Sequence, residues 1–220
     1  MTTPRVPLLC VIATMIPLIL FFSAVSQSKY PETIHVLQEV YVREIQAHLT
    51  YLAYAQKAIS EDSPNIAHLL FALAASEAIH ARNFRQILSD AGVEVKERPS
   101  PEIKVSTTKE NLKNATQAEL QEIDHKYPDY LERIKSEKHE GTILTLTYAW
   151  EAEKQHRTLI EKIQSGTGMF FGMLARTIEK TPHRYFVCQV CGSTLLELPK
   201  GPCPICKNSI TEYKEIEKGK

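Results

Sequence analysis

Two stretches of the chain, residues 76–81 and 152–156, read Ser-Glu-Ala-Ile-His-Ala and Ala-Glu-Lys-Gln-His. Each contains a glutamate followed three residues later by a histidine. Side chains three apart lie on one face of a helix, so each pair points in one direction. Both pairs share their face with apolar residues, which predicts that they lie inside the protein. The pairs are Glu77 with His80 and Glu153 with His156.

Three more carboxylates occupy faces that are expected to be buried: Glu44, Glu119 and Glu122. A buried carboxylate without a partner costs several kcal/mol, and five in one core would repel each other strongly. Two divalent cations resolve that conflict, which predicts a two-metal site inside a helical bundle. Oxygen and nitrogen ligands suit iron or manganese, and zinc also fits. A single Glu-x-x-His is more often a surface pair, so the prediction rests on the combination.

The spacing of apolar residues predicts four long helices. Asp62-Ser63-Pro64 marks a tight turn between the first two, Thr107-x-x-Glu110 is a capping box that opens the third, and Pro128 is expected to kink that third helix. Two short turns around one longer link predict an all-α ferritin-like four-helix bundle. The expected helices cover about residues 31–60, 64–91, 107–138 and 142–164.

The first 28 residues stand apart from this pattern. Residues 6–25 are almost unbroken apolar sequence after Arg5, long enough to cross a bilayer, for which about 20 residues suffice. They also fit a cleaved export signal. A buried core helix is the alternative, although the segment has no polar face. We therefore expect an exported protein, periplasmic or membrane-anchored through residues 6–25.

The totals exclude some classes of partner. Among 220 residues, 26 are Lys or Arg and 26 are Asp or Glu, so the formal net charge is zero. A balanced chain gives no support for nucleic acid as a partner.

The expected organisation is a leader at 1–28, a ferritin-like domain at 29–168, a linker at 169–182 that includes a short helix, and a small domain at 183–220.

Four of the five cysteines fall in the small domain, as Cys188-x-x-Cys191 and Cys203-x-x-Cys206. Each Cys-x-x-Cys forms a tight turn whose sulfurs bind one ion, and two turns complete a tetrahedron. The spacing alone does not choose between a structural zinc and a redox-active iron. Two disulfides are a further alternative in an oxidising compartment.

In combination, these motifs resemble the rubrerythrin family. The first-helix motif is Glu44-Ile-Gln-Ala-His-Leu-Thr-Tyr51, and the third-helix motif includes Glu119-Leu-Gln-Glu122 and Lys126-Tyr127-Pro128. The two Glu-x-x-His stretches match the second and fourth helices. The match spans about residues 32–215 and ends in a rubredoxin-like domain.

The resemblance implies a di-iron centre with bridging Glu77 and Glu153 and terminal Glu44 and Glu119. His156 would bind one iron. The other iron would be held by Glu122 when oxidised and by His80 when reduced. The remaining residues with expected roles at the centre are Tyr51 and Tyr127, which match family tyrosines that hydrogen-bond near the site, although packing of the bundle is an equally good reading.

The function implied is reduction of hydrogen peroxide to water, with electrons relayed through one iron in the four-cysteine site. In the family, head-to-tail dimers place that site near the partner's bundle, so a homodimer is expected. The electron donor is not readable, since no dinucleotide-binding fingerprint occurs. A ferritin-like iron-oxidising or iron-binding protein with a structural zinc ribbon is the alternative; Glu122 and the cysteines argue against it.

Overall fold

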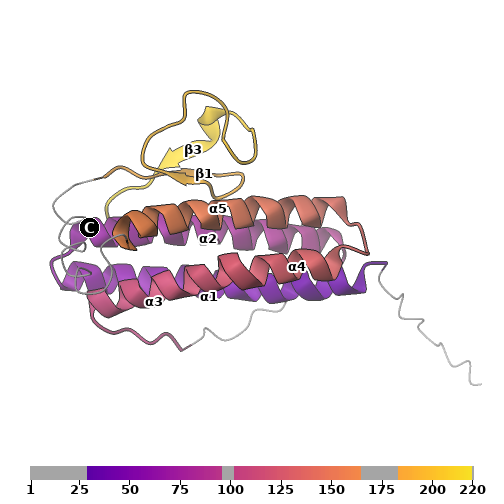
Figure 1. Ribbon diagram of the computed structural model, residues 1–220, viewed down its shortest axis with the longest axis horizontal. Coiled ribbons are helices and arrows are strands. Elements are labelled where there is room, and N and C mark those ends of the chain that lie inside the picture. The colour runs from indigo at the N-terminus through magenta and orange to yellow at the C-terminus, as the bar shows by residue number, and fades with distance from the viewer. Residues whose placement is uncertain (1–28, 96–101, 165–182, 220) are drawn as a thin grey trace, which may run out of the picture.

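The computed structural model describes residues 29–95, 102–164 and 183–219, and four long helical segments dominate it (Figure 1). The predicted leader and the short helix expected over 169–180 lie outside these ranges. The helices are α1 Pro31–Ser60, α2 Pro64–Asp90, α3 Thr108–Gln121, the π-helix η1 Glu122–Lys126, α4 Tyr127–Ile134 and α5 Glu140–Gln164.

The helix ends follow from local sequence. Pro64 opens α2, where its missing N–H is not needed, and Asp62 takes a positive φ of 54° in the tight turn before it. The Thr107 hydroxyl accepts from the Glu110 N–H, so the predicted cap of α3 is confirmed. The short turn makes α1 and α2 antiparallel neighbours, as expected.

The third segment is interrupted earlier than predicted. Its irregularity starts at Glu122, six residues before Pro128, and takes the form of a π-helix rather than a simple kink. Pro128 has no N–H to donate to the Ile123 carbonyl five residues back. The Trp150 indole N–H of α5 donates to that carbonyl instead, at 2.9 Å. Pro128 therefore changes the helix geometry over the whole preceding turn, Glu122–Lys126, and not only at its own position.

The apolar core of the bundle forms two clusters along its length. One surrounds Leu70 and Leu73 of α2, and the other surrounds Phe84 of the same helix. Glu77 and His80 lie between these residues on α2 and are buried. The polar site is thus enclosed by apolar side chains on both sides along the bundle axis.

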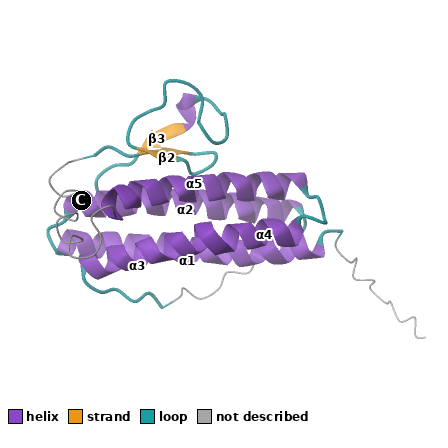
Figure 2. Ribbon diagram, viewed as in Figure 1, coloured by secondary structure: helices purple, strands orange, loops and turns teal. Residues whose placement is uncertain are grey.

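The small domain contains a three-stranded antiparallel sheet, ordered β2-β1-β3, with β1 Phe186–Cys188, β2 Thr194–Leu195 and β3 Tyr213–Glu215. It lies over α2 and α5, on the side of the bundle away from α1 and α3 (Figures 1 and 2). The fold is a ferritin-like four-helix bundle followed by a four-cysteine domain of the rubredoxin-like kind, as predicted.

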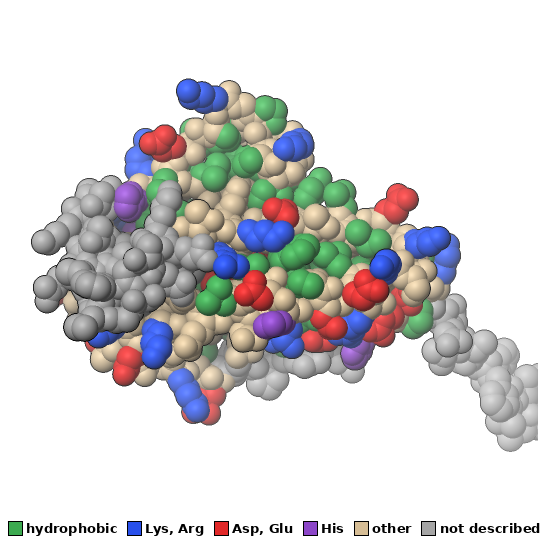
Figure 3. Space-filling model, in the orientation of Figure 1, with side chains coloured by type: hydrophobic (Ala, Val, Ile, Leu, Met, Phe, Trp, Pro, Cys, Tyr) green, Lys and Arg blue, Asp and Glu red, His purple; other side chains and the backbone are tan. Residues whose placement is uncertain are grey.

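Acidic and basic side chains are interspersed over the visible face of the bundle, with apolar side chains between them (Figure 3). This distribution agrees with the balanced charge of the chain. In the three described ranges, no helix is both long enough and apolar enough to span a membrane. The predicted span at residues 6–25 lies outside those ranges.

Candidate metal centres

Six of the seven predicted bundle ligands converge between the helices. Their ligand atoms form two groups, and within each group these atoms lie within 4.8 Å of one another. Two carboxylates, Glu77 and Glu153, belong to both groups, so they lie where bridging ligands would be placed. The first group is Glu44, Glu77, His80 and Glu153; the second is Glu77, Glu119, Glu153 and His156.

The chemistry of this cluster fits a pair of cations. All six side chains are at most 5% exposed, and four of them are carboxylates. One buried oxygen of Glu119 and one of Glu153 have no hydrogen-bond partner among the described residues. The Glu153 oxygen is 3.0 Å from His80 Nδ1 but lacks hydrogen-bond geometry. Buried carboxylate oxygens left in this way match a site for divalent metal ions.

Burial and mutual repulsion shift the acidity of the cluster. Burial raises the pKa of Glu77 and of Glu119 well above the ordinary value, and the charge of Glu153 raises both further. Burial also opposes the charge of Glu153, but attraction to His156, the hydrogen bond with that histidine and the proximity of His80 hold its pKa well below the ordinary range. Without cations, protons must neutralise these carboxylates, so metal binding and proton release are linked.

The two predicted tyrosines both reach the cluster. The Tyr127 hydroxyl donates to Glu44 Oε1 at 2.5 Å, and the Tyr51 hydroxyl donates to Glu119 Oε1. Burial, together with these carboxylates, raises the pKa of each tyrosine well above 10. Each phenol therefore keeps its proton and fixes one terminal carboxylate.

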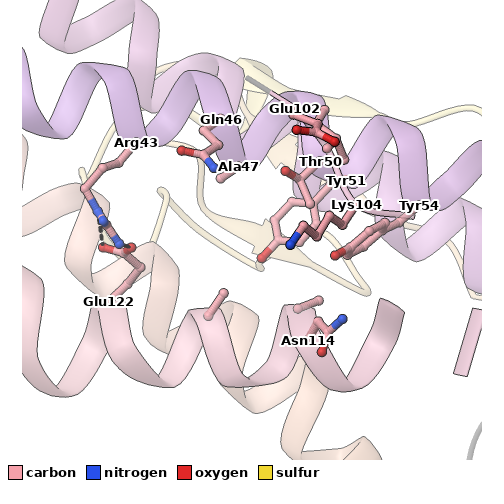
Figure 4. Close-up of a pocket in the computed structure, with 13 residues that line it drawn as sticks. Arg43, Gln46, Ala47, Thr50, Tyr51, Tyr54, Glu102, Lys104, Asn114 and Glu122 are labelled. Carbon is pink, nitrogen blue, oxygen red and sulfur yellow. Dashed lines mark hydrogen bonds and ion pairs between the residues drawn. The ribbon is translucent and has the colours of Figure 1, made fainter. Parts of the chain in front are cut away.

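The seventh predicted ligand, Glu122, lies outside both groups. Its carboxylate pairs with the Arg43 guanidinium of α1 through both oxygens, and Arg43 Nε lies 3.4 Å from Glu122 Oε2 (Figure 4). Glu122 therefore does not join the other six side chains in this conformation, and its role as a ligand stays a prediction. The physical reason is the ion pair with the partly exposed guanidinium of Arg43. The sequence pattern did not predict this pair.

In the small domain, the four cysteine sulfurs form a third group, separate from the two in the bundle. The sulfurs of Cys188 and Cys206 are 3.8 Å apart, and those of Cys191 and Cys203 are 3.6 Å apart. A disulfide needs about 2.0 Å, so the disulfide alternative does not fit. Metal–sulfur bonds of about 2.3 Å imply tetrahedron edges of about 3.8 Å. The four thiols are therefore set for one tetrahedral ion.

One hydroxyl completes the surroundings of the sulfurs. Tyr213 donates to Cys203 Sγ at 3.2 Å and lies 2.8 Å from the Ser193 hydroxyl. Hydrogen bonds from the Cys188 and Cys191 thiols, and the one from Tyr213, lower the pKa of Cys203 despite burial. A donor to a ligating sulfur tunes the potential of a bound metal.

The two candidate centres are joined through the backbone of the first cysteine turn. Four successive carbonyls of that turn, residues 189–192, accept hydrogen bonds from side chains of α2. In particular, His80 Nε2 lies 3.2 Å from the Cys191 carbonyl. The donors, in order along the turn, are Arg82, Asn83, His80 and Ser76.

The second histidine is oriented from the same domain. His156 Nε2 lies 3.3 Å from the Thr194 hydroxyl, which itself donates to the Gly192 carbonyl. With both Nε2 atoms hydrogen-bonded to the small domain, both Nδ1 atoms face the carboxylates. The resemblance placed the cysteine site near a partner's bundle; in this structure it lies against the bundle of its own chain.

Comparison with known proteins agrees with this geometry. The family model for rubrerythrin matches residues 35–164, more than half of the chain. The chain belongs to the rubrerythrin family. Rubrerythrin-2 of Clostridium acetobutylicum is 31% identical over 174 residues, covering 79% of this chain and 91% of the relative. Rubrerythrin-1 of the same organism is 26% identical over 188 residues, covering 81% and 91%.

Solved structures support the fold of this rubrerythrin-family chain. Fully reduced, all-ferrous nigerythrin superimposes with a TM-score of 0.68 at 22% identity, covering 83% of this chain and 86% of nigerythrin. An open-pore ferritin from Archaeoglobus fulgidus gives a TM-score of 0.57 at 15% identity, covering 70% and 99%. At these identities the likeness concerns the fold alone.

Several residues of the site were missed by sequence reasoning, among them Arg43, Gln155 and Gly192. Arg43 precedes Glu44 directly, and Gln155 lies inside the fourth-helix motif, where its Oε1 accepts from the Ser193 hydroxyl at 2.8 Å and the Thr194 N–H at 3.1 Å. Gly192 follows Cys191 and has a positive φ of 80°. A glycine directly after a metal-binding turn is a sequence signal for such a backbone conformation. The other two give no pattern that would separate them from surface residues.

Proposed function

We propose that this rubrerythrin-family protein is a peroxidase that reduces hydrogen peroxide to water in the bundle. Iron would be held in the bundle by the six clustered side chains, with Glu122 as an exchanging seventh ligand, and one iron would be held by the four cysteines. When bound, the bundle metals supply Lewis acidity and electrons for breaking the O–O bond.

The observation that carries the proposal is the hydrogen bond between His80 and the Cys191 carbonyl. Cys191, a predicted ligand of the cysteine site, is one hydrogen bond away from His80, a predicted ligand of the bundle site. A zinc ribbon that only stabilised the tail of the chain would not need such a connection. The direct path supports one-electron transfer from the cysteine site to the bundle.

The surrounding residues would perform the positioning and proton chemistry. Tyr51 and Tyr127 hold Glu119 and Glu44 by neutral hydroxyl donors, so these carboxylates keep their orientation as charge changes. Glu122 is the most exposed of the five predicted carboxylate ligands, with a side chain 20% exposed. We assign to Glu122 the transfer of protons between solvent and the buried carboxylates.

The arrangement corresponds to the ligand set that the family resemblance assigns to the reduced state. His80 Nδ1 is in the first ligand group, and Glu122 is outside it. The exchange between the two would require Glu122 to leave Arg43. This supports a role for Glu122 that changes with oxidation state.

Anaerobic titration of the reduced, metal-quantified protein with hydrogen peroxide tests the function. We expect stoichiometric oxidation of the bundle metals, followed by oxidation of the thiolate-bound iron, which turns red as it becomes ferric. In Glu122→Ala, the bundle metals should remain while peroxide turnover slows. Unchanged peroxide kinetics in this variant would refute the role of Glu122. A colourless, zinc-filled cysteine site with no peroxide turnover would favour iron binding or oxidation instead.

We also propose export through the N-terminal segment and assembly as a homodimer. Export follows from the apolar residues 6–25, and N-terminal sequencing of the protein from separated cell fractions tests it. The dimer follows from the family resemblance, and light scattering on the purified protein tests it. Because the cysteine site contacts its own bundle, the proposed electron path does not require a partner chain.

A further inference from the structure

A cavity on the α1–α3 side of the bundle leads toward the carboxylate cluster. This outer cavity has a volume of about 380 Å³ and lies between α1, α3 and the segment that starts at Glu102 (Figure 4). Its lining is largely polar and charged and includes Thr50, Lys104 and Asn114. We call it the vestibule.

A second, smaller cavity lies inward of the vestibule. Its volume is about 50 Å³, and its lining includes Glu44, Glu77, Glu119 and Glu153, the four carboxylates of the cluster. This inner chamber has room for a molecule of the size of water or hydrogen peroxide, since a cavity of about 10–15 Å³ on the same measure already holds one water. A hydroperoxide with a branched alkyl group needs more space, which only an opening of the chamber wall would supply.

The vestibule and the inner chamber share one wall. Five residues line both cavities: Arg43, Ala47, Tyr51, Ala118 and Glu122. Two of them, Arg43 and Glu122, reach across from α1 and from the start of η1 and form an ion pair. Figure 4 shows the pair at one end of the vestibule, with Lys104 and Tyr54 near the other end.

We propose that the Arg43–Glu122 ion pair is a gate between the vestibule and the inner chamber, and that Arg43 is the residue that selects small hydroperoxides over bulky ones. This inference rests on the proposed peroxidase function, which it deepens. Arg43 acts through Glu122 and is a positioning residue. When the pair opens, one side chain leaves the shared wall, and Glu122 becomes available to the cluster.

The location of the pair gives the gate its properties. The two side chains are 36% and 20% exposed, so water competes for both and the pair opens at small cost. Arg43 also lines a third cavity, with His35, Gln38, Glu39 and Val42, into which its guanidinium has space to move. A π-helix begins at Glu122, and such turns are adjustable elements at functional sites.

The rate at which metal-free protein takes up Co²⁺ in the bundle tests the gate without any peroxide chemistry. Carboxylate-bound Co²⁺ absorbs weakly, whereas thiolate-bound Co²⁺ gives intense charge transfer, so stopped-flow absorption separates the two sites. Removing an exposed ion pair such as Arg43–Glu122 should raise the fraction of molecules with an open gate by about two- to fivefold. We expect Arg43→Gln to accelerate bundle loading by that factor, with unchanged stoichiometry.

Two further variants control for charge and for general loosening. Arg43→Lys keeps the positive charge with weaker pairing and should load at an intermediate rate. Arg133→Gln removes another ion pair of the bundle, from Arg133 to Glu32 and Glu39, and should leave loading unchanged. Equal loading rates in Arg43→Gln and the wild type would overturn the gate.

Selectivity is measured with hydrogen peroxide and tert-butyl hydroperoxide as substrates of the iron-loaded protein. In Arg43→Gln, kcat/KM for the bulky substrate should rise, so that the preference for hydrogen peroxide falls about two- to fivefold. An unchanged preference would overturn the selective role of Arg43. If the wild type does not turn over peroxide but Co²⁺ loading responds to Arg43, the peroxidase proposal fails while the gate stands.

Discussion

The two candidate metal sites of this protein are built in opposite ways. The cysteine site takes its ligands from two tight turns, Cys188–Cys191 and Cys203–Cys206, so that most of its geometry is local. The bundle site takes its ligands from α1, α2, α3 and α5, and helix packing must bring them together. Local sites tolerate changes elsewhere in the fold, whereas the bundle site depends on every helix that supplies a ligand.

The contrast is sharpest in a variant that removes a shared ligand. Glu153 belongs to both bundle groups, so we expect Glu153→Ala to lose both bundle metals and to keep the cysteine-bound one. Metal analysis together with thiolate-to-iron absorption measures the two sites separately. Glu151→Ala on the same helix, where Glu151 pairs with Lys154 at the surface, is the control. Full bundle occupancy in Glu153→Ala would contradict the bridging assignment.

The connection between the two sites is tested at Gly192. A Cβ at this position would lie 2.3 Å from His80 Nε2 and 2.7 Å from Ser76 Oγ, so the cysteine turn must move away from α2 in Gly192→Ala. We expect transfer of electrons into the bundle to slow, because the hydrogen bond between His80 and the Cys191 carbonyl is stretched or lost. Stopped-flow oxidation of the thiolate-bound iron after mixing with peroxide measures it.

Gly92→Ala is the matched control for this variant. Gly92 has a similar positive φ of 72°, but a Cβ there would meet nothing within 4 Å. The two variants share the backbone strain and differ in the clash with His80. Equal transfer rates in both would show that the contact between the sites is not part of the electron path.

A smaller effect is expected at the cysteine site alone. Tyr213→Phe removes the hydroxyl that donates to Cys203 Sγ. A hydrogen bond of about 0.5–1.5 kcal/mol that favours the more negative, reduced state corresponds to about 20–60 mV. We expect the potential of the bound iron to fall by this amount in a redox titration, while the bundle metals are unaffected. An unchanged potential would contradict the influence assigned to Tyr213.

The smallest effect concerns the helix that carries Glu119. The Glu61 carboxylate accepts from the Thr108 N–H at the start of α3, and this bond, with Lys57, lowers the pKa of Glu61 to about 2. A lowered pKa in the folded protein stabilises it above about pH 4.5, and this contribution disappears as the pH falls toward 2. Glu61→Gln should therefore be less stable than the wild type at neutral pH, with a difference that shrinks on acidification.

Thermal unfolding of the metal-free proteins at several pH values measures that difference. Metal content in Glu61→Gln should match that of the wild type. The hydrogen bond from the Thr108 N–H to Glu61 holds the N-terminal end of α3, whereas the predicted ligand Glu119 lies near its C-terminal end. A stability difference that grows as the pH falls would contradict the sign of this contribution.

Much of the fold was predictable from the sequence because its signals are local. The bounds of α1 match the apolar spacing, and the cap at Thr107 follows from a four-residue pattern. The π-helix at Glu122–Lys126 was not predicted. It depends on Trp150, which is distant in sequence and donates to a carbonyl that Pro128 leaves without its usual donor.

The sequence by itself determined which side chains are available for metal: two Glu-x-x-His pairs, further glutamates on apolar faces, and two cysteine turns. Spacing within one helix or turn fixes such sets, because the relevant distances span only a few residues. Only the tertiary structure decided that Arg43 holds Glu122 outside the cluster and that the Cys191 carbonyl meets His80. Those contacts join segments distant in the chain, and helix packing and domain placement determine them.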